Sequence, residues 1–307
     1  MTLVTCAGCG GALRNRFARV VDPRTREPFA LDECQDCGLG HTQPQPEHLA
    51  PYYGDTYHGG RHGVTADWCN LRRLGWVREA RGPGAAGRLL DVGCGDGSFL
   101  RAARERGWSV LGTEFNPRGA RQAGLEVYER LEEVLPRGPF DCITLWHSLE
   151  HLKDPLAALR QLTGALAPGG VMVVAVPDAD GAQARLFGAA WFHLDVPRHL
   201  FHFGRGSLTR MLERAGLQVE HHWHQELEYD VMGAAQSALN VLMPTPNVFF
   251  DRLTGKPSEG SITERTLSFA LGPALSALAL TPVTLTTLLG RGGTLIVSAR
   301  PAASPSP

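Results

Sequence analysis

The chain has 307 residues, 43% of them hydrophobic, which suits one full α/β domain with additions and a sizeable core. The formal net charge is −1 and the sequence has no long basic stripe of the kind that binds nucleic acid, so no nucleic-acid partner is expected. The first residues contain neither the basic stretch nor the apolar run of a signal peptide, which predicts a cytoplasmic protein.

Cysteine spacing sets apart the start of the chain. Two C-x-x-C pairs, Cys6 with Cys9 and Cys34 with Cys37, are separated by 24 residues. Four thiolates at this spacing match a tetrahedral zinc site, and because they leave no open coordination position, we expect the ion to be structural. A zinc ribbon is therefore expected over residues 1–45. Unrelated thiols or a redox pair are the alternative.

Residues 46–84 are expected to form a linker and lid segment. The sequence Gln43-Pro44-Gln45-Pro46 predicts a semi-rigid connection, and Tyr52, Tyr53 and Tyr57 follow it. Two roles fit these tyrosines. In the first, they form a lid over a positively charged ligand, because cations favour aromatic faces, and Tyr57 is the first candidate for the contact with that ligand. Alternatively, they pack the ribbon onto the next domain.

A glycine-rich turn follows. The run LLDVGCGDGSFL at residues 89–100 predicts a buried strand that passes through this turn into a helix. Asp91 ends the strand, and Cys94 lies between the glycines. Gly93, Gly95 and Gly97 let backbone approach backbone or ligand without a Cβ in the way, and the free N–H groups of a helix start hold a carboxylate or a ribose. The turn therefore predicts a nucleotide-like ligand.

Strands and helices alternate from there on. A second apolar strand at residues 109–114 ends in Glu114, and a carboxylate there can accept both hydroxyls of a ribose. Asn116 and Pro117 predict a helix start, and Asp154 with Pro155 predicts another. In the second helix, leucines at 156, 159, 162 and 166 recur at helical spacing. The other expected strands are residues 125–129, 141–147, 169–177, 217–223 and 294–299, and the other expected helix begins at Ser207. This alternation indicates an α/β fold.

The sequence of the loop from Asp91 to Gly97 resembles motif I of the class I S-adenosylmethionine-dependent methyltransferases. With the ribbon, the linker, the sequence WHSLEH at 146–151 and the sequence DVPRHL at 195–200, the chain is similar to bacterial enzymes that methylate sugars, polysaccharide precursors and natural products. The resemblance implies a Rossmann-like seven-stranded sheet with helices on both faces, whose last two strands close it as an antiparallel pair. It implies S-adenosylmethionine as cofactor. The residues expected to bind it are Asp91, Gly93, Cys94, Gly95, Gly97, Glu114, Phe115, Tyr57 and His147.

Methylation of a hydroxyl also requires a proton acceptor. His147, Glu150 and His151 follow the fourth strand, where the resemblance places the reaction, and the two histidines share one face if a helix begins there. His151 is the first candidate base with Glu150 as orienting partner, and His199 is the second. The alternative is that His151 only caps or packs the helix start. We expect an oxygen atom of a small or carrier-linked molecule as the acceptor, with carbon or nitrogen as alternatives.

The segment at 191–203 is dense in histidine and aromatic residues. Loops at the carboxyl ends of strands face the ligand crevice of a doubly wound sheet, so this segment is expected to line the acceptor pocket. His193, Arg198 and His202 are the expected substrate-binding residues. Two roles fit Arg198 equally: it fixes a phosphate or carboxylate of the acceptor, or it pairs with Asp195.

Residues 231–250 and 266–290 carry no charge, and each run is long enough for a membrane span, but four prolines interrupt them and a polar turn at 251–265 separates them. We therefore expect an apolar helical hairpin at 231–290 that caps the acceptor site, contacts a second copy, or lies on a membrane surface. The other expected divisions are the methyltransferase core at 85–230, its last strand at 291–300 and a disordered tail at 301–307. A non-catalytic scaffold that binds the cofactor is the alternative to an enzyme.

Overall fold

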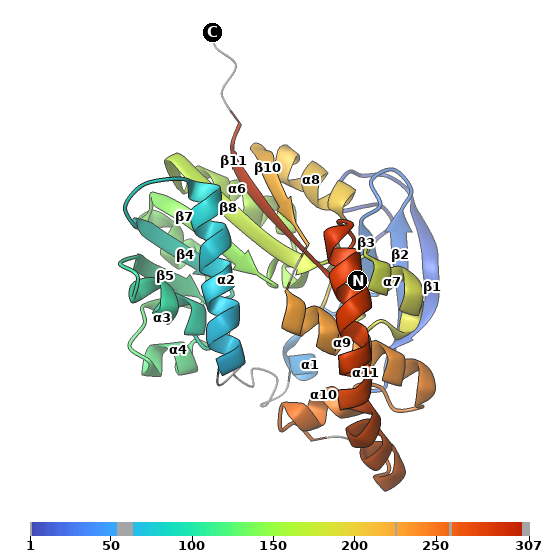
Figure 1. Ribbon diagram of the computed structural model, residues 1–307. Helices are drawn as coiled ribbons and strands as arrows, with labels where there is room; N and C mark the ends of the chain where they lie inside the picture. The colour runs from blue at the N-terminus through green and yellow to red at the C-terminus, as the bar shows by residue number, and fades with distance from the viewer. Residues whose placement is uncertain (1, 54–63, 225, 258–259, 303–307) are drawn as a thin grey trace. The chain divides into compact units, whose positions relative to one another are not determined.

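A computed structural model describes residues 2–53, 64–224, 226–257 and 260–302, and the side chains of 64–66 are not described (Figure 1). The chain divides into two compact units. Unit 1 combines residues 1–59, 177–208 and 224–295, and unit 2 combines residues 60–176, 209–223 and 296–307. Residues 177–208, expected within a core of 85–230, thus group with the N-terminal and helical segments.

A seven-stranded sheet is the centre of unit 2. Its order is β10-β11-β8-β7-β4-β5-β6, with β4 parallel to β5 and β7 and with β10 antiparallel to β11. This confirms the expected fold class and the closing antiparallel pair. The strands are β4 (Arg88–Val92), β5 (Ser109–Thr113), β6 (Val127–Tyr128), β7 (Phe140–Trp146), β8 (Leu166–Pro177), β10 (Leu217–Trp223) and β11 (Thr294–Pro301). Because β5 and β7 flank β4 on opposite sides, the strand order reverses there, which is where such sheets bind ligands.

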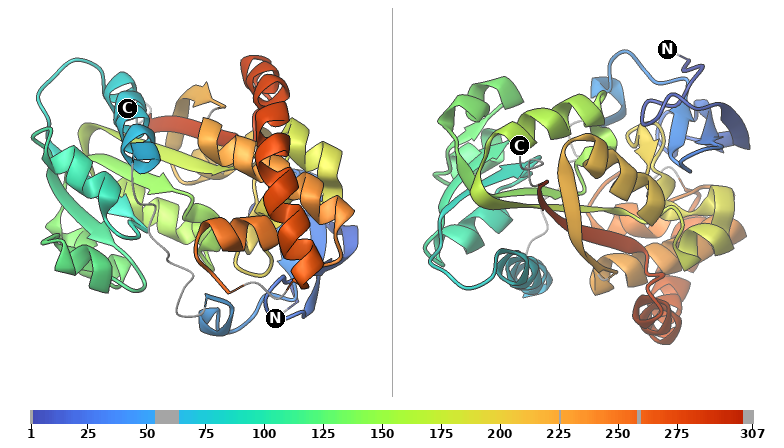
Figure 2. Two further views of the ribbon diagram at one scale, coloured as in Figure 1. Left: turned by 60° about the horizontal axis from the view of Figure 1, so that its bottom comes forward. Right: turned by 90° about the horizontal axis from the view of Figure 1, so that it is seen from above.

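Helices cover both faces of this sheet. α2 (Val64–Arg81) and α3 (Ser98–Arg104) lie on one face and α6 (Pro155–Gly164) on the other (Figure 1; Figure 2, right). Asp154 caps α6 as expected, because its carboxylate accepts a hydrogen bond from the Ala157 N–H. The remaining short helices are α4 (Arg118–Gln122), α5 (Leu131–Val134), η1 (Leu135–Arg137), η2 (Leu149–His151) and, at the boundary between the units, α8 (Arg205–Arg214).

The boundary between α6 and β8 differs from the prediction. Leu166 continues the helical spacing of leucines in the sequence, yet α6 ends at Gly164 and Leu166 begins β8. The cause is a hydrogen bond from the Phe140 N–H to the Ala165 carbonyl, which draws this turn into the sheet before the expected strand start at 169.

A four-stranded sheet of order β1-β2-β3-β9 organises unit 1. Its strands are β1 (Leu13–Val21), β2 (Pro28–Cys34), β3 (Gly40–Gln43) and β9 (Phe201–His202), so a strand from far along the chain completes the cysteine-bearing segment. The Gln43 side chain bonds the main chain of Leu3 at 3.0 and 2.9 Å, so the chain is fixed to this sheet where the proline-bearing connection at 43–46 begins. The helices here are α1 (Ala50–Tyr53), α7 (Ala182–Phe187), η3 (Gly188–Ala190) and η4 (Phe192–Leu194).

The expected helical hairpin is present in unit 1 with an additional helix. α9 (Leu227–Leu242) runs beside α11 (Ile262–Leu288), and α10 (Val248–Leu253) lies between them in the chain (Figure 2, left). Pro273 and Pro282 lie inside α11, so the expectation that they interrupt the second apolar run is wrong. α11 buries only Ser268, Gly272 and Val283, and by length and composition alone it is long and apolar enough to cross a membrane.

Candidate functional site

The glycine loop in unit 2 has three left-handed glycines, Gly93 (φ 76°), Gly95 (φ 55°) and Gly97 (φ 74°). A Cβ at Gly93 would lie 2.6 Å from the Cβ of Ser148, and one at Gly97 would lie 2.2 Å from a methyl carbon of Leu125. A Cβ at Gly95 would meet nothing within 4 Å. Packing therefore requires glycine at 93, whereas a Cβ at 97 would displace the end of the Leu125 side chain, and Gly95 faces open space that a ligand can use.

Two acids end the strands beside this loop. One carboxylate oxygen of Glu114 accepts a hydrogen bond from the Gly95 N–H at 2.8 Å, and the other accepts one from the Asn116 N–H at 3.3 Å. Each oxygen of a carboxylate can accept two hydrogen bonds, so each Glu114 oxygen keeps one lone pair for a hydroxyl group. The loop and this acid therefore fit the ribose and the adjoining part of the expected cofactor.

Asp91 has a different environment. It is buried, and its carboxylate accepts a 2.7 Å hydrogen bond from the Thr144 hydroxyl. Burial raises the pKa of Asp91 to about 7, against the lowering effects of Thr144 and of the nearby Arg73 charge. Thr144 was not among the residues predicted from the sequence. The available signal was its place near the end of the predicted fourth strand, since it is the register partner of Asp91 in β7.

The other residues proposed around the cofactor differ in exposure. Cys94 is buried, and burial raises the pKa of its thiol, which keeps it neutral. The Phe115 side chain is 73% exposed beside Glu114. Tyr57 lies outside the described residues. Tyr52 instead packs edge-on against Phe29 and donates a 2.6 Å hydrogen bond to Glu27, so this tyrosine packs on the sheet of unit 1.

The histidines after β7 do not share a helical face. His147 has a left-handed backbone (φ 52°), and only a 3-10 turn at Leu149–His151 follows, so the expectation of a helix face shared by His147 and His151 is wrong. The His147 Nδ1 atom lies 3.7 Å from a carboxylate oxygen of Glu150, whose side chain is 1% exposed. His151 is partly exposed at the end of this turn.

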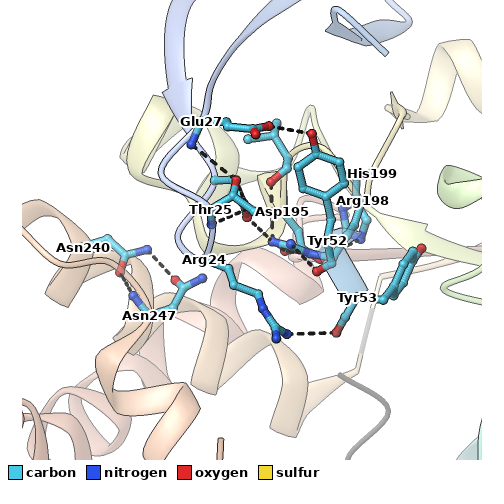
Figure 3. Close-up of polar contacts among 12 residues, drawn as sticks. Arg24, Thr25, Glu27, Tyr52, Tyr53, Asp195, Arg198, His199, Asn240 and Asn247 are labelled. Atoms are coloured by element: carbon cyan, nitrogen blue, oxygen red, sulfur yellow. Dashed lines mark hydrogen bonds and ion pairs between the residues drawn. The ribbon is translucent and has the colours of Figure 1, made fainter. Parts of the chain in front are cut away.

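Arg198 in unit 1 joins two acids. Its guanidinium bonds Asp195 at 2.6 Å and the fully buried Asp22 at 2.9 Å, and it also donates to the carbonyl of Tyr52 (Figure 3). This is the ion pair that the sequence analysis gave as one of two roles for Arg198. Asp22 was missed, because its contact with Arg198 spans 176 positions of sequence.

The three histidines of the same segment are buried. The Nδ1 atom of His199 lies 2.9 Å from the His193 carbonyl, and its Nε2 atom lies 3.9 Å from Asp195. The His193 ring packs 4.4 Å from the ring of Tyr229. His202 belongs to β9, where its Nε2 atom is 3.0 Å from the Thr42 hydroxyl, and burial lowers the pKa of this histidine well below its usual value. His199 and the residues expected to bind the acceptor thus lie in unit 1, and His147, Glu150 and His151 lie in unit 2.

The four N-terminal cysteines meet in unit 1. Their sulfur atoms all lie within 4.8 Å of one another, with Cys6 and Cys37 3.5 Å apart and Cys9 and Cys34 3.4 Å apart. The N–H groups of Gly8 and Gly11 point at the sulfurs of Cys6 and Cys9. Burial raises the pKa values of Cys6 and Cys37, whereas for Cys34 N–H donors outweigh burial and lower the pKa to about 7. Four such sulfurs can hold a tetrahedral cation.

Comparison with known proteins adds to this geometry. Residues 61–222, more than half of the chain, match a family described as a methyltransferase domain. The ubiquinone biosynthesis O-methyltransferase of Thiobacillus denitrificans is 28% identical over 169 residues, 49% of this chain and 72% of that relative. The enzyme of the same name from Aeromonas salmonicida is 30% identical over 168 residues, 49% of this chain and 71% of its own. A solved SAM-dependent methyltransferase from Archaeoglobus fulgidus is 17% identical, with 82% of this chain and 99% of that chain covered and a TM-score of 0.47.

Proposed function

Because this chain belongs to the methyltransferase-domain family and is a SAM-dependent methyltransferase, we propose that it methylates an oxygen atom of a small or carrier-linked acceptor, such as a sugar, a glycan precursor or a natural product. The name O-methyltransferase of its curated relatives supports oxygen as the acceptor atom. Methylation of carbon or nitrogen is the alternative.

The Glu114 carboxylate beside Gly95 is the observation that supports binding of the methyl donor. In our assignment, Glu114 accepts the ribose hydroxyls, and the open face at Gly95 lets the cofactor approach the backbone. When bound, S-adenosylmethionine supplies a methyl group on a positively charged sulfur. What the chain must add is alignment of the acceptor and removal of its proton.

Calorimetric titration of the protein with S-adenosylmethionine tests the donor site. We expect Glu114→Gln to weaken binding about tenfold or more, because it removes the charge from two hydrogen bonds to the ribose. Glu133→Gln is the control, since Glu133 is also an acid of unit 2 but pairs with Arg130 on the surface. Equal affinities of Glu114→Gln and the unchanged protein would contradict the assignment.

We assign the proton-acceptor role first to His151 and second to His199. His151 is only partly buried, so its ring can reach a ligand, whereas His199 is 5% exposed and its Nδ1 lies against a carbonyl. Glu150 and His147 complete the polar group beside His151. Loss of the base should lower the maximal rate and flatten its rise with pH while cofactor affinity stays the same. Methylation that survives both His151→Ala and His199→Ala would refute both assignments.

An acceptor screen identifies the substrate class. The protein is incubated with S-adenosylmethionine and, in separate reactions, with sugar nucleotides, phenols and lipid-linked sugars, and products are detected by the added mass of a methyl group. We expect a product whose new methyl group is on oxygen, as fragmentation would locate it. A methyl group on carbon or nitrogen would overturn this part of the proposal. Cofactor binding without any product would exclude these three classes of acceptor.

For the cysteine cluster, we propose a structural zinc ion. A zinc–sulfur bond of about 2.3 Å in a tetrahedron places sulfurs roughly 3.8 Å apart, which is close to the separations seen here. Metal analysis of purified protein should find one zinc per chain, and the double change Cys6→Ser and Cys9→Ser should abolish it. Cys69→Ala, at a buried cysteine outside the cluster, is the control. Zinc that persists in the double variant would refute this site.

For the apolar helix α11, we propose contact with a second copy of the chain, with a membrane surface as the alternative. Leu278 and Leu288 are 72% and 78% exposed, and no charged residue lies between positions 266 and 290 to attract anionic lipid. Light scattering should show a dimer that Leu278→Glu dissociates, whereas Val4→Glu, at another exposed apolar position, should not. A monomer that sediments with lipid vesicles would support the membrane alternative instead.

A further inference from the structure

Unit 1 contains a cavity of about 550 Å³ that the proposed function does not use. It lies between the end of β1 with the turn that follows, the segment at 189–196, and the connection between α9 and α10. Its volume is in the range of pockets that hold small organic ligands. All its lining residues belong to unit 1, so its shape depends on this unit alone.

Several non-glycine residues with left-handed backbone line this cavity. Among the described residues, four that are not glycine have a clearly positive φ, and three of them line it: Arg26 (φ 62°), Asp195 (φ 37°) and Asn247 (φ 63°). Each of these conformations is costly for a side-chain-bearing residue, most of all for arginine, and such residues cluster at ligand clamps and active sites. The three come from three separate segments of the chain, so a local turn preference does not explain their convergence.

Polar networks fix the walls of the cavity. On one side, Arg198 ties Asp195 to Asp22 at the start of the turn that carries Arg26. On the other side, the Asn240 amide donates to the Asn247 side chain at 3.1 Å and accepts from the Asn247 N–H at 2.9 Å (Figure 3). These contacts hold the rim in place without a ligand, which makes the cavity preformed.

The lining defines the chemistry of a ligand. Arg19 and Arg26 bring two positive charges to the lining against one acid, Asp195, which is bonded to Arg198. The rest of the wall is largely apolar and includes Val20, Trp191, Leu194, Met243, Pro244 and Pro246. Cationic donors beside apolar side chains match a molecule with an anionic group and an apolar body.

We propose that this cavity binds a small organic anion with an apolar body, such as a phosphate ester or a carboxylate. The ligand's anionic group meets Arg19 and Arg26, and its apolar body lies against Trp191 and Met243. The proposal concerns a site in unit 1 and does not require the assignments made around Glu114 in unit 2.

Calorimetry with naphthyl phosphate tests the proposal, with naphthol and inorganic phosphate as probes that lack the charge or the apolar body. We expect naphthyl phosphate to bind more tightly than either probe. The double change Arg19→Gln and Arg26→Gln should weaken naphthyl phosphate binding about tenfold and leave naphthol binding unchanged. Arg24→Gln is the matched control, because Arg24 belongs to the same turn but donates to the carbonyl of Tyr53 and does not line the cavity.

A second variant keeps the test independent of charge. Ala189→Trp fills the cavity from its exposed rim, so it should abolish naphthyl phosphate binding without unfolding the protein, as thermal unfolding would verify. S-adenosylmethionine affinity, measured in the same variants, should not change, which separates this site from the donor site. Three results would each overturn the proposal: no binding to the unchanged protein, equal losses in Arg24→Gln and the double variant, or binding that survives Ala189→Trp.

Discussion

Replacement of Gly93 by alanine tests how the cofactor loop is built. The left-handed backbone at Gly93 costs an alanine about 1 kcal/mol. The new methyl carbon would also lie 2.6 Å from the Ser148 Cβ, which is attached to the backbone and cannot rotate away. Overpacking of this kind costs about 1–3 kcal/mol. Gly93→Ala should therefore destabilise the protein by roughly 2–4 kcal/mol.

Gly95 provides the matched control for this change. Its φ is also positive, but a Cβ there meets nothing within 4 Å, so Gly95→Ala should cost only the backbone preference of about 1 kcal/mol. The same methyl group projects into the space assigned to the cofactor. Gly95→Ala should thus weaken S-adenosylmethionine binding more than it weakens the fold.

Chemical denaturation measures both stabilities, and calorimetry measures both affinities. In the double variant Gly93→Ala with Ser148→Gly, the clashing atom is gone, so the overpacking cost should be recovered as a coupling energy of about 1–3 kcal/mol. If Gly93→Ala and Gly95→Ala were equally stable, or if removal of the Ser148 side chain recovered nothing, the close contact between this loop and Ser148 would not be the reason for glycine at position 93.

Three further predictions concern charge and capping. Burial raises the pKa of Asp91 from 3.8 to about 7, so between pH 3.8 and pH 7 the folded protein holds a proton that the unfolded chain has released. The free energy of unfolding should therefore fall as the pH rises through this range, by at most about 4 kcal/mol. Asp91→Asn should remove this pH dependence, as denaturation curves at several pH values would show. Arg198→Leu removes the cation that pairs with the buried Asp22 and should cost about 3–5 kcal/mol. Arg16→Leu, at the partly exposed pair with Glu33, should cost about 1 kcal/mol or less, and similar losses in the two variants would argue against a buried ion pair at Arg198. Asp154→Ala should cost about 1 kcal/mol in thermal unfolding, and no loss would mean that the Asp154 cap does not stabilise α6.

Local pattern accounts for what the sequence predicts correctly. The strand at 88–92, its glycine turn and the next helix are one continuous stretch, so apolar runs and turn residues suffice to place them. The same holds for the Asp154 cap. The pattern misled where tertiary contacts decide: Leu166 keeps the helical spacing but joins the sheet, and His147 takes a left-handed conformation instead of starting a helix.

Contacts between distant segments could not be predicted from the sequence, because they depend on tertiary structure and not on local pattern. Nothing in the sequence around Asp22 indicates that it meets Arg198, and the two-residue strand β9 is too short to give a periodic signal. The cavity at Arg26, Asp195 and Asn247 belongs to this class, because each residue has an unremarkable local sequence and only the fold brings the three together. Side chains that act through such contacts require the structure.

The two acids beside the glycine loop carry separate roles, which the sequence alone does not distinguish. Asp91 is buried and accepts a hydrogen bond from Thr144, which joins β4 to β7, and burial raises its pKa to about 7. Among the described residues, the donors to Glu114 are backbone N–H groups, one on each oxygen, so both oxygens keep acceptor capacity. The loop itself is held by the Gly93 and Cys94 N–H groups, which both donate to the Thr113 carbonyl. In our proposal, Glu114 and the open face of Gly95 meet the cofactor.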